Sequence, residues 1–520
     1  MKNINRRLYY LFLLVSIFGC SEESDDIPQQ ELPTEDNGCA ERIIDEIVPN
    51  ASSYDWEFKL IETFDDADVT TPETGLNDNL ENRRLHGALK SSLWTRKEGE
   101  EVEKHPSQWY SQVNHPAKPN AISFHVENAA VMLLDPIESG SDDGYKVSFV
   151  TNPIKEDRES DSWTSFMLDA VTGKKGYVKA TQFGFSIASN GEVKVYQNGN
   201  QKTVTGTVSD ADEYEVMLII TPGQLVGHIN GQEISAVLDE DLPKTAYLFL
   251  GAEIEKESGN VSWIDEVIVS TRFSQSESHL LYYGYYWASG YYGEHLTEVS
   301  AYTNFNFIEK IRNDLPNEKK HVLQARWEFW GGSDGALNSN WQALWAEKLV
   351  HIKANIDKIR AIYLVDEPFW AANINVDDYN MVLDQIRADL PNMPIITVFA
   401  YPTIEDTEDT RISDINCNID WVGADKYVAL NKFDQIENMN NLLMQAQPEK
   451  DIFLVPQTFF QGTETDAEVA EMNWKFYNYA LQNNKIKGIW NFGLWTHQQP
   501  DQLPLSLKVQ KIIGNAIVNN

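Results

Sequence analysis

The pattern of apolar and polar residues changes once along the chain, near residue 275. Before that point, short segments alternate apolar and polar residues, as strands with one buried face do. Examples are residues 121–126, 145–150, 183–187 and 215–220. Asn-Gly pairs at 190–191, 198–199 and 230–231 favour tight hairpin turns. Because no long segment here has a helical period, residues 56–272 are predicted to form an all-β, two-sheet sandwich.

After residue 275, short apolar segments alternate with longer amphipathic ones, as strands and helices do in α/β domains. The predicted strands are residues 280–285, 303–307, 321–326, 361–366, 393–399, 419–425, 451–456 and 486–491. The clearest predicted helices are residues 341–356, 377–390, 433–446 and 466–482. Strand centres from residue 325 to residue 490 lie about 33 residues apart, the length of one strand–helix unit. Residues 276–520 are therefore predicted to form an α/β TIM barrel.

The composition limits the classes of partner. The chain has 79 acidic and 42 basic residues, and its net charge of −37 repels phosphates, which argues against nucleic acid. Three cysteines cannot build a disulfide framework or a metal cluster, and none of the ten histidines falls in a metal-like pair. We expect a monomer that needs no cofactor.

Residues 1–20 have the pattern of an export signal. Three basic residues precede an apolar run at 8–18, which is shorter than a typical transmembrane helix and suits the apolar region of a signal peptide. The run ends in Ile17-Phe18-Gly19-Cys20, which resembles a bacterial lipobox. The resemblance implies that Cys20 becomes the lipidated first residue, carrying palmitate or a similar acyl chain. An ordinary signal peptide is the alternative.

Residues 21–55 are polar, acidic and interrupted by prolines, and they are predicted to be a disordered tether. The acidic stretch at 21–26 resembles the export tails of surface lipoproteins in Gram-negative polysaccharide degraders. It implies a protein anchored by lipid to the cell outer membrane and exposed on its surface. With Cys20 acylated, Cys39 and Cys417 are expected to be free thiols.

Chemistry is expected where the predicted barrel strands end, because barrels bind ligands at the carboxyl ends of their strands. Aromatic, acidic, basic and amide side chains gather at these positions. They are Tyr285, Trp287, Arg326, Glu328, Trp330, Asp366, Glu367, Trp370, Tyr401, Asp425, Tyr427, Gln457, Asn491 and Trp495. Aromatic faces stack on the C–H faces of sugars, and carboxylates and amides bind sugar hydroxyls. The set predicts a carbohydrate substrate, although structural aromatics would give a similar pattern.

The fourth strand carries the most specific signal, Asp366-Glu367-Pro368. Glu367 is the candidate general acid and Asp366 its partner, because a neighbouring carboxylate raises the pKa of an acid and keeps it protonated. The alternative is structural, since Asp or Glu before Pro also suits the first turn of a helix.

Glu367-Pro368 resembles the retaining glycoside hydrolases of the large (β/α)8 clan, whose acid/base Glu ends strand four before a Pro. Tyr427 on strand six and either Trp490 or Trp495 on strand eight match other positions that this clan uses. Two positions depart from the clan: Asp366 stands where it has Asn, and Gln457 stands where it has the nucleophilic Glu. Glutamine cannot form the glycosyl-enzyme ester of the two-carboxylate retaining mechanism.

The adjacent acids also resemble those of hexosaminidases that use the 2-acetamido group of the substrate as nucleophile. In that resemblance Glu367 protonates the leaving oxygen and Asp366 holds the acetamide. Alternatively, Asp425 or Glu328 serves as the base of an inverting enzyme. Sequence spacing leaves both mechanisms open.

Two classes of function follow. The first is a surface glycoside hydrolase, and the second is a non-catalytic surface glycan-binding lipoprotein, suggested by Gln457. In either, the sandwich is an ancillary domain, since residues 62–66 and 262–267 resemble the first and last strands of laminin-G or concanavalin-like jelly rolls. Similar jelly rolls often hold calcium, for which Asp65, Asp66 and Asp265 are weak candidates.

Overall fold

The structure is a computed structural model, and it describes these residues: 54–62, 94–96, 121–124, 129–133, 136–139, 144–153, 162–170, 181–254, 262–274, 279–286, 295–312, 315, 320–332, 335–370, 373–406 and 408–518. The predicted signal, Cys20, Cys39 and nearly all of the predicted tether lie outside the described residues, as do Trp287, Asp65 and Asp66. No helix in the described ranges is long and apolar enough to span a membrane.

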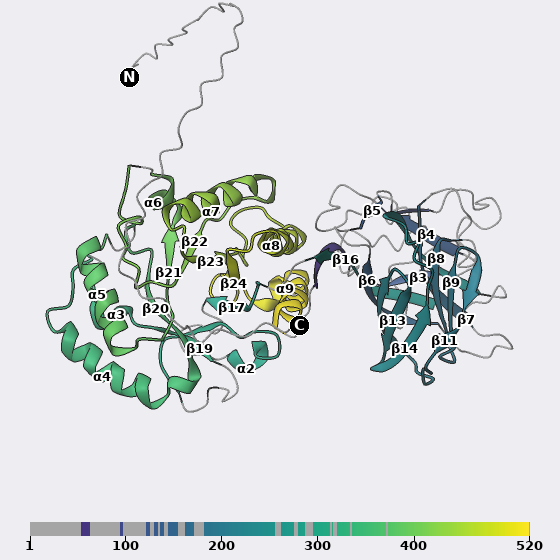
Figure 1. The fold of residues 1–520 in the computed structure, drawn as a ribbon, viewed down its shortest axis with the longest axis horizontal. Helices are drawn as coiled ribbons and strands as arrows, with labels where there is room; N and C mark the ends of the chain where they lie inside the picture. The colour runs from purple at the N-terminus through teal and green to yellow at the C-terminus, as the bar shows by residue number, and fades with distance from the viewer. Residues whose placement is uncertain are drawn as a thin grey trace, which may run out of the picture. The chain divides into compact units, whose positions relative to one another are not determined.

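The first domain consists of antiparallel strands in two eight-stranded sheets (Figure 1). One sheet runs β1-β16-β6-β12-β13-β14-β11, with β3 also on β16; the other runs β10-β9-β8-β7-β15-β4-β2, with β5 on β15. The strands are β1 (Tyr54–Glu62), β2 (Trp94–Arg96), β3 (Ile122–Phe124), β4 (Ala129–Leu133), β5 (Ile137–Glu138), β6 (Tyr145–Asn152), β7 (Ser162–Asp169), β8 (Phe183–Ala188), β9 (Val193–Gln197), β10 (Asn200–Lys202), β11 (Val204–Thr205), β12 (Tyr214–Thr221), β13 (Gln224–Ile229), β14 (Gln232–Val237), β15 (Thr245–Ile254) and β16 (Ser262–Ser274).

Alternation and turn chemistry build this sandwich as predicted. Every second residue of β6 and β12 is buried, and these residues pack with those of the facing sheet into one apolar core. Asn198-Gly199 joins β9 to β10, and Asn230-Gly231 joins β13 to β14. All four of these turn residues have positive φ, as a two-residue hairpin turn of type I′ requires.

Of the three candidate calcium ligands in the sandwich, only Asp265 lies in the described residues. Asp265 is buried, and one of its carboxylate oxygens accepts a hydrogen bond from the backbone N–H of Glu266 at 2.8 Å. The described residues contain no group of three His, Cys, Asp or Glu arranged to hold a metal ion. A structural calcium site therefore stays a prediction.

The second domain is a parallel eight-stranded barrel in the order β17-β24-β23-β22-β21-β20-β19-β18. Its strands are β17 (Tyr282–Tyr286), β18 (Asn306–Ile308), β19 (His321–Gln324), β20 (Ile359–Asp366), β21 (Ile395–Ala400), β22 (Trp421–Asp425), β23 (Asp451–Val455) and β24 (Ile486–Phe492). Its helices are α2 (Leu296–Val299), α3 (Arg326–Phe329), α4 (Trp341–Ala354), α5 (Val376–Asp389), α6 (Tyr401–Glu405), α7 (Asp434–Ala446), α8 (Asp466–Leu481) and α9 (Pro504–Val518), with short 3-10 turns at Ile356–Lys358, Leu430–Lys432 and Pro500–Gln502. The longer helices surround the strands (Figure 1). The predicted fold class, a jelly-roll-like sandwich followed by a TIM barrel, is confirmed.

Side-chain amides complete the barrel between β17 and β18. Asn304 accepts from the backbone N–H of Tyr283 at 3.0 Å and donates to the carbonyl of Leu281 at 2.9 Å. Asn306 accepts from the N–H of Tyr285 at 3.0 Å. Gly284 permits this approach, because a Cβ there would lie 1.9 Å from the carbonyl oxygen of Phe305. The barrel is therefore nearly closed.

The barrel lumen is a packed aromatic core. In its lower layer the ring of Tyr282 lies 5.1 Å from that of Trp421. In its upper layer, towards the carboxyl ends of the strands, the ring of Trp490 lies 5.0 Å from that of Tyr286 and 5.1 Å from that of Tyr363. The lumen is filled in the way usual for TIM barrels, so ligands are confined to its ends.

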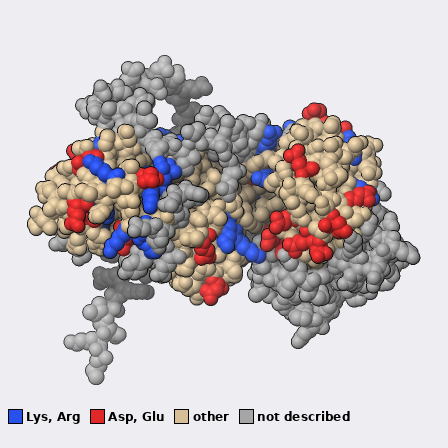
Figure 2. Space-filling model, turned by 90° about the horizontal axis from the view of Figure 1, so that it is seen from below, with Lys and Arg blue, Asp and Glu red and all other residues tan. Residues whose placement is uncertain are grey.

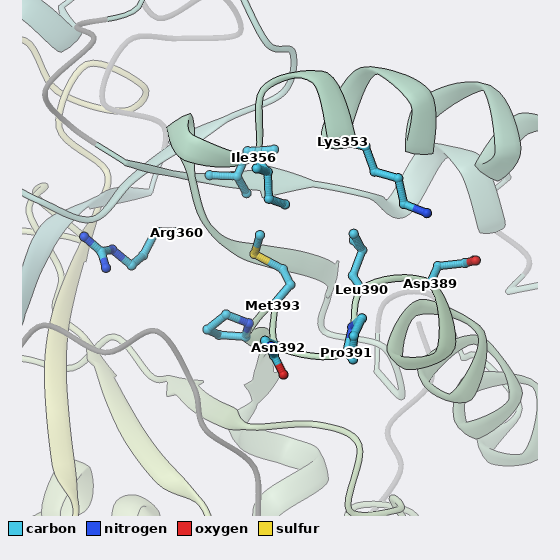
Figure 3. A pocket seen from close by; sticks show the side chains of 10 residues that line it. Lys353, Ile356, Arg360, Asp389, Leu390, Pro391, Asn392 and Met393 are labelled. Atoms are coloured by element: carbon cyan, nitrogen blue, oxygen red, sulfur yellow. The ribbon is translucent and has the colours of Figure 1, made fainter.

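A cavity of about 350 Å³ lies at the amino ends of β20 and β21. Figure 3 shows Ile356, Leu390 and Met393 around it, with Lys353 and Asp389 to one side. Because barrel chemistry is carried by the carboxyl ends of the strands, this cavity is at the opposite end from the predicted catalytic residues. It is not the candidate active site.

Candidate active site

A break in the regular pleat of β20 presents the two acids. Ala361 and Tyr363 point into the lumen, but Leu364 and Val365 both pack into the outer core. The register with β21 shifts between Tyr363 and Asp366 at this point. Asp366 thereby returns to the lumen side, where it meets Tyr363. A regular strand would have alternated these side chains without a shift.

Glu367 follows in a left-handed backbone conformation, with φ of +46°. For a residue with a side chain this conformation costs about 1–3 kcal/mol, and such residues cluster at functional sites. The N–H of Glu367 still donates to the carbonyl of Val398 at 2.9 Å. Both Asp366 and Glu367 interact electrostatically with Asp425, so the break and the left-handed residue bring two sequence neighbours to the same side.

Asp366 contacts two tyrosines of the upper aromatic layer, Tyr363 and Tyr286. The hydroxyl of Tyr363 donates to its Oδ1 at 2.6 Å. Burial raises the pKa of Asp366, while hydrogen bonds from Tyr363 and Tyr286 and the nearby charge of Arg326 oppose that rise. The side chain is therefore fixed in direction by its tyrosine partners.

The pKa of Glu367 is raised into the range that suits a general acid. Burial, and then the neighbouring charge of Asp366, raises its pKa to about 7. Its side chain is partly exposed, so its proton is accessible to a ligand. A carboxyl with a pKa near the working pH is suited to proton transfer in both directions.

Asp425 at the end of β22 is the third carboxyl group. Burial, followed by the charges of Asp366 and Glu367, raises its pKa well above the ordinary value. The hydroxyl of Tyr427 donates to its Oδ2 at 3.1 Å, whereas its Oδ1 is buried and accepts no hydrogen bond from the described residues. Three acids so close together cannot all be ionised near neutral pH.

Three of the predicted aromatic residues lie at or just after the ends of β20, β21 and β22. Tyr427 stacks on Phe492 at 5.6 Å, and Trp370, three residues after Glu367, is 58% exposed. Tyr401 at the end of β21 has the ammonium group of Lys426 3.0 Å from its ring centre. These side chains are accessible to solvent or border the acids.

Three other predicted residues are engaged with the helix layer. Tyr285 is 1% exposed and donates to Oε1 of Gln510 on α9 at 2.8 Å, so it faces the helix layer. Trp330 is fully buried and stacks on Tyr379 at 6.0 Å. Glu328 forms an ion pair with Lys348 on α4 at 3.0 Å. None of the three is retained in the site.

The remaining predicted residues form a buried layer on β23 and β24. Gln457 donates to the carbonyl of Phe459 at 2.8 Å, and Asn491 donates to that of Gly284 at 3.0 Å. Trp495 is 7% exposed, has φ of +67°, and stacks on His295 at 5.3 Å. Their side chains contact other parts of the fold, and little of their surface is exposed to a ligand.

Sequence reasoning missed Tyr286 and Tyr363. Tyr286 is the lumen-facing neighbour of Tyr285, and strand alternation relative to Tyr282 was the signal that would have selected it. Tyr363 could not be found by alternation, because the break in β20 changes its relation to Asp366.

The predicted free thiol at Cys417 is wrong, because Cys417 forms a disulfide bond. The prediction assumed that acylation of Cys20 left two isolated cysteines with no reason to meet. Sequence separation alone does not decide whether two cysteines come within bonding distance in the folded chain.

No protein-family model and no curated protein matches the chain. Among solved structures, a curdlan-specific exo-beta-1,3-glucanase of GH128 from Blastomyces gilchristii is 10% identical, covering 44% of this chain and 97% of its own, with a TM-score of 0.32. A ruminal GH26 endo-beta-1,4-mannanase is 9% identical, covering 75% and 88%, with a TM-score of 0.30. Lectin I-B4 from Griffonia simplicifolia is 10% identical, covering 35% and 92%, with a TM-score of 0.25. These scores are low, and the function proposed below is based on the side chains of the site.

Proposed function

We propose that the chain is a glycoside hydrolase in which Glu367 is the general acid. The observation that carries this proposal is the partly exposed carboxyl group of Glu367 at the end of β20, beside Asp366 and within electrostatic reach of Asp425. Burial and the charge of Asp366 raise the pKa of this group to about 7. Exposed or bordering aromatics such as Trp370 and Tyr427 supply the apolar faces on which sugars stack. The acid and the aromatics occur at the end of the barrel where ligands bind.

The first step is transfer of the Glu367 proton to the glycosidic oxygen as the bond from that oxygen to the anomeric carbon breaks. Gln457 cannot supply a carboxylate nucleophile from strand seven. We propose instead that the carbonyl oxygen of a 2-acetamido group attacks the anomeric carbon, with Asp366 orienting the acetamide. Water then opens the cyclic intermediate, and the Glu367 carboxylate removes the proton of that water.

The alternative mechanism has Asp425 as the base that activates water, with inversion at the anomeric carbon. The raised pKa of Asp425 makes it a poor base near neutral pH, since a base must be ionised to accept a proton. Asp366 is better suited to orientation than to base catalysis, because Tyr363 already donates to it at 2.6 Å. Substrate assistance therefore has the stronger support.

The test compares E367Q, D366N and the control E408Q, an exposed glutamate that follows α6. Each is assayed against aryl glycosides with and without a 2-acetamido group, and the anomer of the product is followed by NMR. We expect E367Q to lower kcat by about 10²–10⁴-fold and E408Q to leave it unchanged. Wild-type activity confined to 2-acetamido substrates with retention supports substrate assistance, and inversion supports Asp425.

A non-catalytic glycan-binding protein is the second candidate, favoured by Gln457 at the position of the missing nucleophile. Wild-type protein that binds glycans but releases no reducing ends, across substrates with and without the acetamide, would establish this candidate. Equal turnover by wild-type protein and E367Q would remove Glu367 from the mechanism.

We also propose export and lipid anchoring at Cys20 on the outer membrane. The lipobox-like sequence that ends in Cys20 supports this location. Labelling cells with a palmitate analogue should mark the wild-type chain and not C20A. Protease accessibility in intact cells distinguishes surface exposure from an inward-facing anchor.

A further inference from the structure

We propose a second carbohydrate-binding subsite on the barrel, centred on Trp327, that holds a further unit of the glycan cleaved at Glu367. The subsite is the cavity lined by Glu309, Ile311, Trp327, Glu328, Lys348 and His351, termed here the Trp327 cavity, with a volume of about 790 Å³. This volume is within the usual range for ligand sites. The inference rests on the proposed function and narrows its substrate to oligosaccharide chains.

The indole of Trp327 is exposed, unlike the other tryptophans of this region. It is 48% exposed, whereas Trp330, Trp341 and Trp345 are at most 9% exposed. The side chain of Trp327 is close enough to Glu309 to oppose the rise in the pKa of that carboxyl group. An indole that keeps a large exposed area beside a carboxyl group is a suitable platform for a sugar ring.

The cavity lies between the start of the β18–β19 connection and α4. Glu309 and Ile311 line it from the connection, and Leu344, Lys348 and His351 line it from one face of α4. The hollow is therefore bordered by a well-formed helix.

The charges of the cavity suit a neutral, hydroxyl-rich ligand. Glu328 is neutralised by Lys348 at 3.0 Å, and burial raises the pKa of Glu309. Figure 2 shows Lys and Arg among Asp and Glu over part of one face of the molecule, whereas another part of that face carries mainly Asp and Glu. Lys310 and Glu347 also line the cavity and add one charge of each sign. The charged side chains offer donors and acceptors for hydroxyls, and their opposite signs do not favour one kind of ion.

Arg326 connects the Trp327 cavity to the catalytic acids. Its guanidinium lies 5.2 Å from the ring centre of Trp327, and its charge acts on Asp366. Arg326 is therefore close to the exposed indole and also acts on one of the two acids. In the proposed arrangement, a glycan with one unit at Glu367 extends past Arg326 and places a further unit on Trp327.

The binding test uses full-length protein carrying E367Q, so that bound glycan is not cleaved. W327A, W327F and the control V350A are added to this background, because Val350 is 67% exposed on α4 and does not line the cavity. The probes are neutral and 2-acetamido oligosaccharides of one to six units, measured by calorimetry. We expect W327A to weaken binding of the longest bound probe by about tenfold, W327F to recover part of it, and V350A to match the parent.

Steady-state kinetics of W327A, with Glu367 unchanged, separate this inference from the proposed function. We expect its loss in kcat/KM to be about tenfold larger for the oligosaccharide than for the aryl monosaccharide. Equal losses on both substrates, or binding by W327A equal to that by V350A, would overturn the subsite while leaving hydrolysis established. Binding without any turnover would overturn the hydrolase alone, and absence of binding to every probe would overturn both.

Discussion

Replacing Glu367 with Gln should stabilise the protein at alkaline pH while removing its activity. The folded state raises the pKa of this carboxyl from 4.5 to about 7, so folding disfavours the ionised form. Stability from this group is fully present below pH 4.5 and is lost as the pH rises to about 7. Gln is neutral at every pH, so E367Q avoids the loss.

The pKa change corresponds to about 3 kcal/mol. Because water screens a partly exposed carboxyl, we expect a gain of about 2 kcal/mol for E367Q over wild type at pH 8. At pH 4 the two proteins should have nearly the same free energy of unfolding, since Glu367 is then protonated in the folded state and largely so in the unfolded state.

The assay is urea unfolding followed by tryptophan fluorescence at pH 4 and pH 8, for wild type, E367Q and the exposed control E408Q. The control removes one negative charge without removing a buried one, so it should not show the pH-dependent gain. A difference between E367Q and wild type that is the same at both pH values would refute the reasoning, because the carboxyl would then have no raised pKa.

Three further predictions follow from the same structure. The kcat/KM of wild type should fall above about pH 7 as Glu367 loses its proton, and D366N should move this limb to lower pH in a pH–rate profile, because it removes a charge that raises the pKa of Glu367. His321 is 1% exposed, and burial is the chief cause that lowers its pKa to about 4. The free energy of unfolding should therefore fall by about 3 kcal/mol between pH 6.5 and pH 4, and H321Q should lack this fall. The same change of unfolding free energy with pH in wild type and H321Q would contradict the prediction. G284A should lower the free energy of unfolding by more than about 3 kcal/mol or prevent folding, because its Cβ would lie 1.9 Å from a backbone oxygen of Phe305; a fully stable G284A would show that β17 and β18 can separate.

The sequence was sufficient for the fold because local patterns specify it. Alternation in β6 and β12, Asn-Gly at the hairpins and apolar runs such as Ile359–Asp366 each match the element found. Such patterns depend on which residues are buried and on turn geometry, and both are properties of neighbouring residues.

The site was predicted less completely because its geometry depends on departures from regular structure. Asp366 and Glu367 were identified as a pair, but their presentation to the same side requires the register shift in β20. Tyr285 was chosen over Tyr286 because both follow an apolar run, and only the position relative to the lumen separates them. Trp330 was chosen over Trp327 in the same way, because the strand pattern does not show which of the two packs on Tyr379 of α5 and is buried.

The left-handed backbone at Glu367 bears on whether this chain still catalyses a reaction. Glycine would adopt that conformation without strain, and asparagine with little. A chain whose barrel served only as a scaffold would gain stability by drifting to either residue there. A glutamate in so unfavourable a conformation is therefore what the proposed use of its carboxyl group predicts.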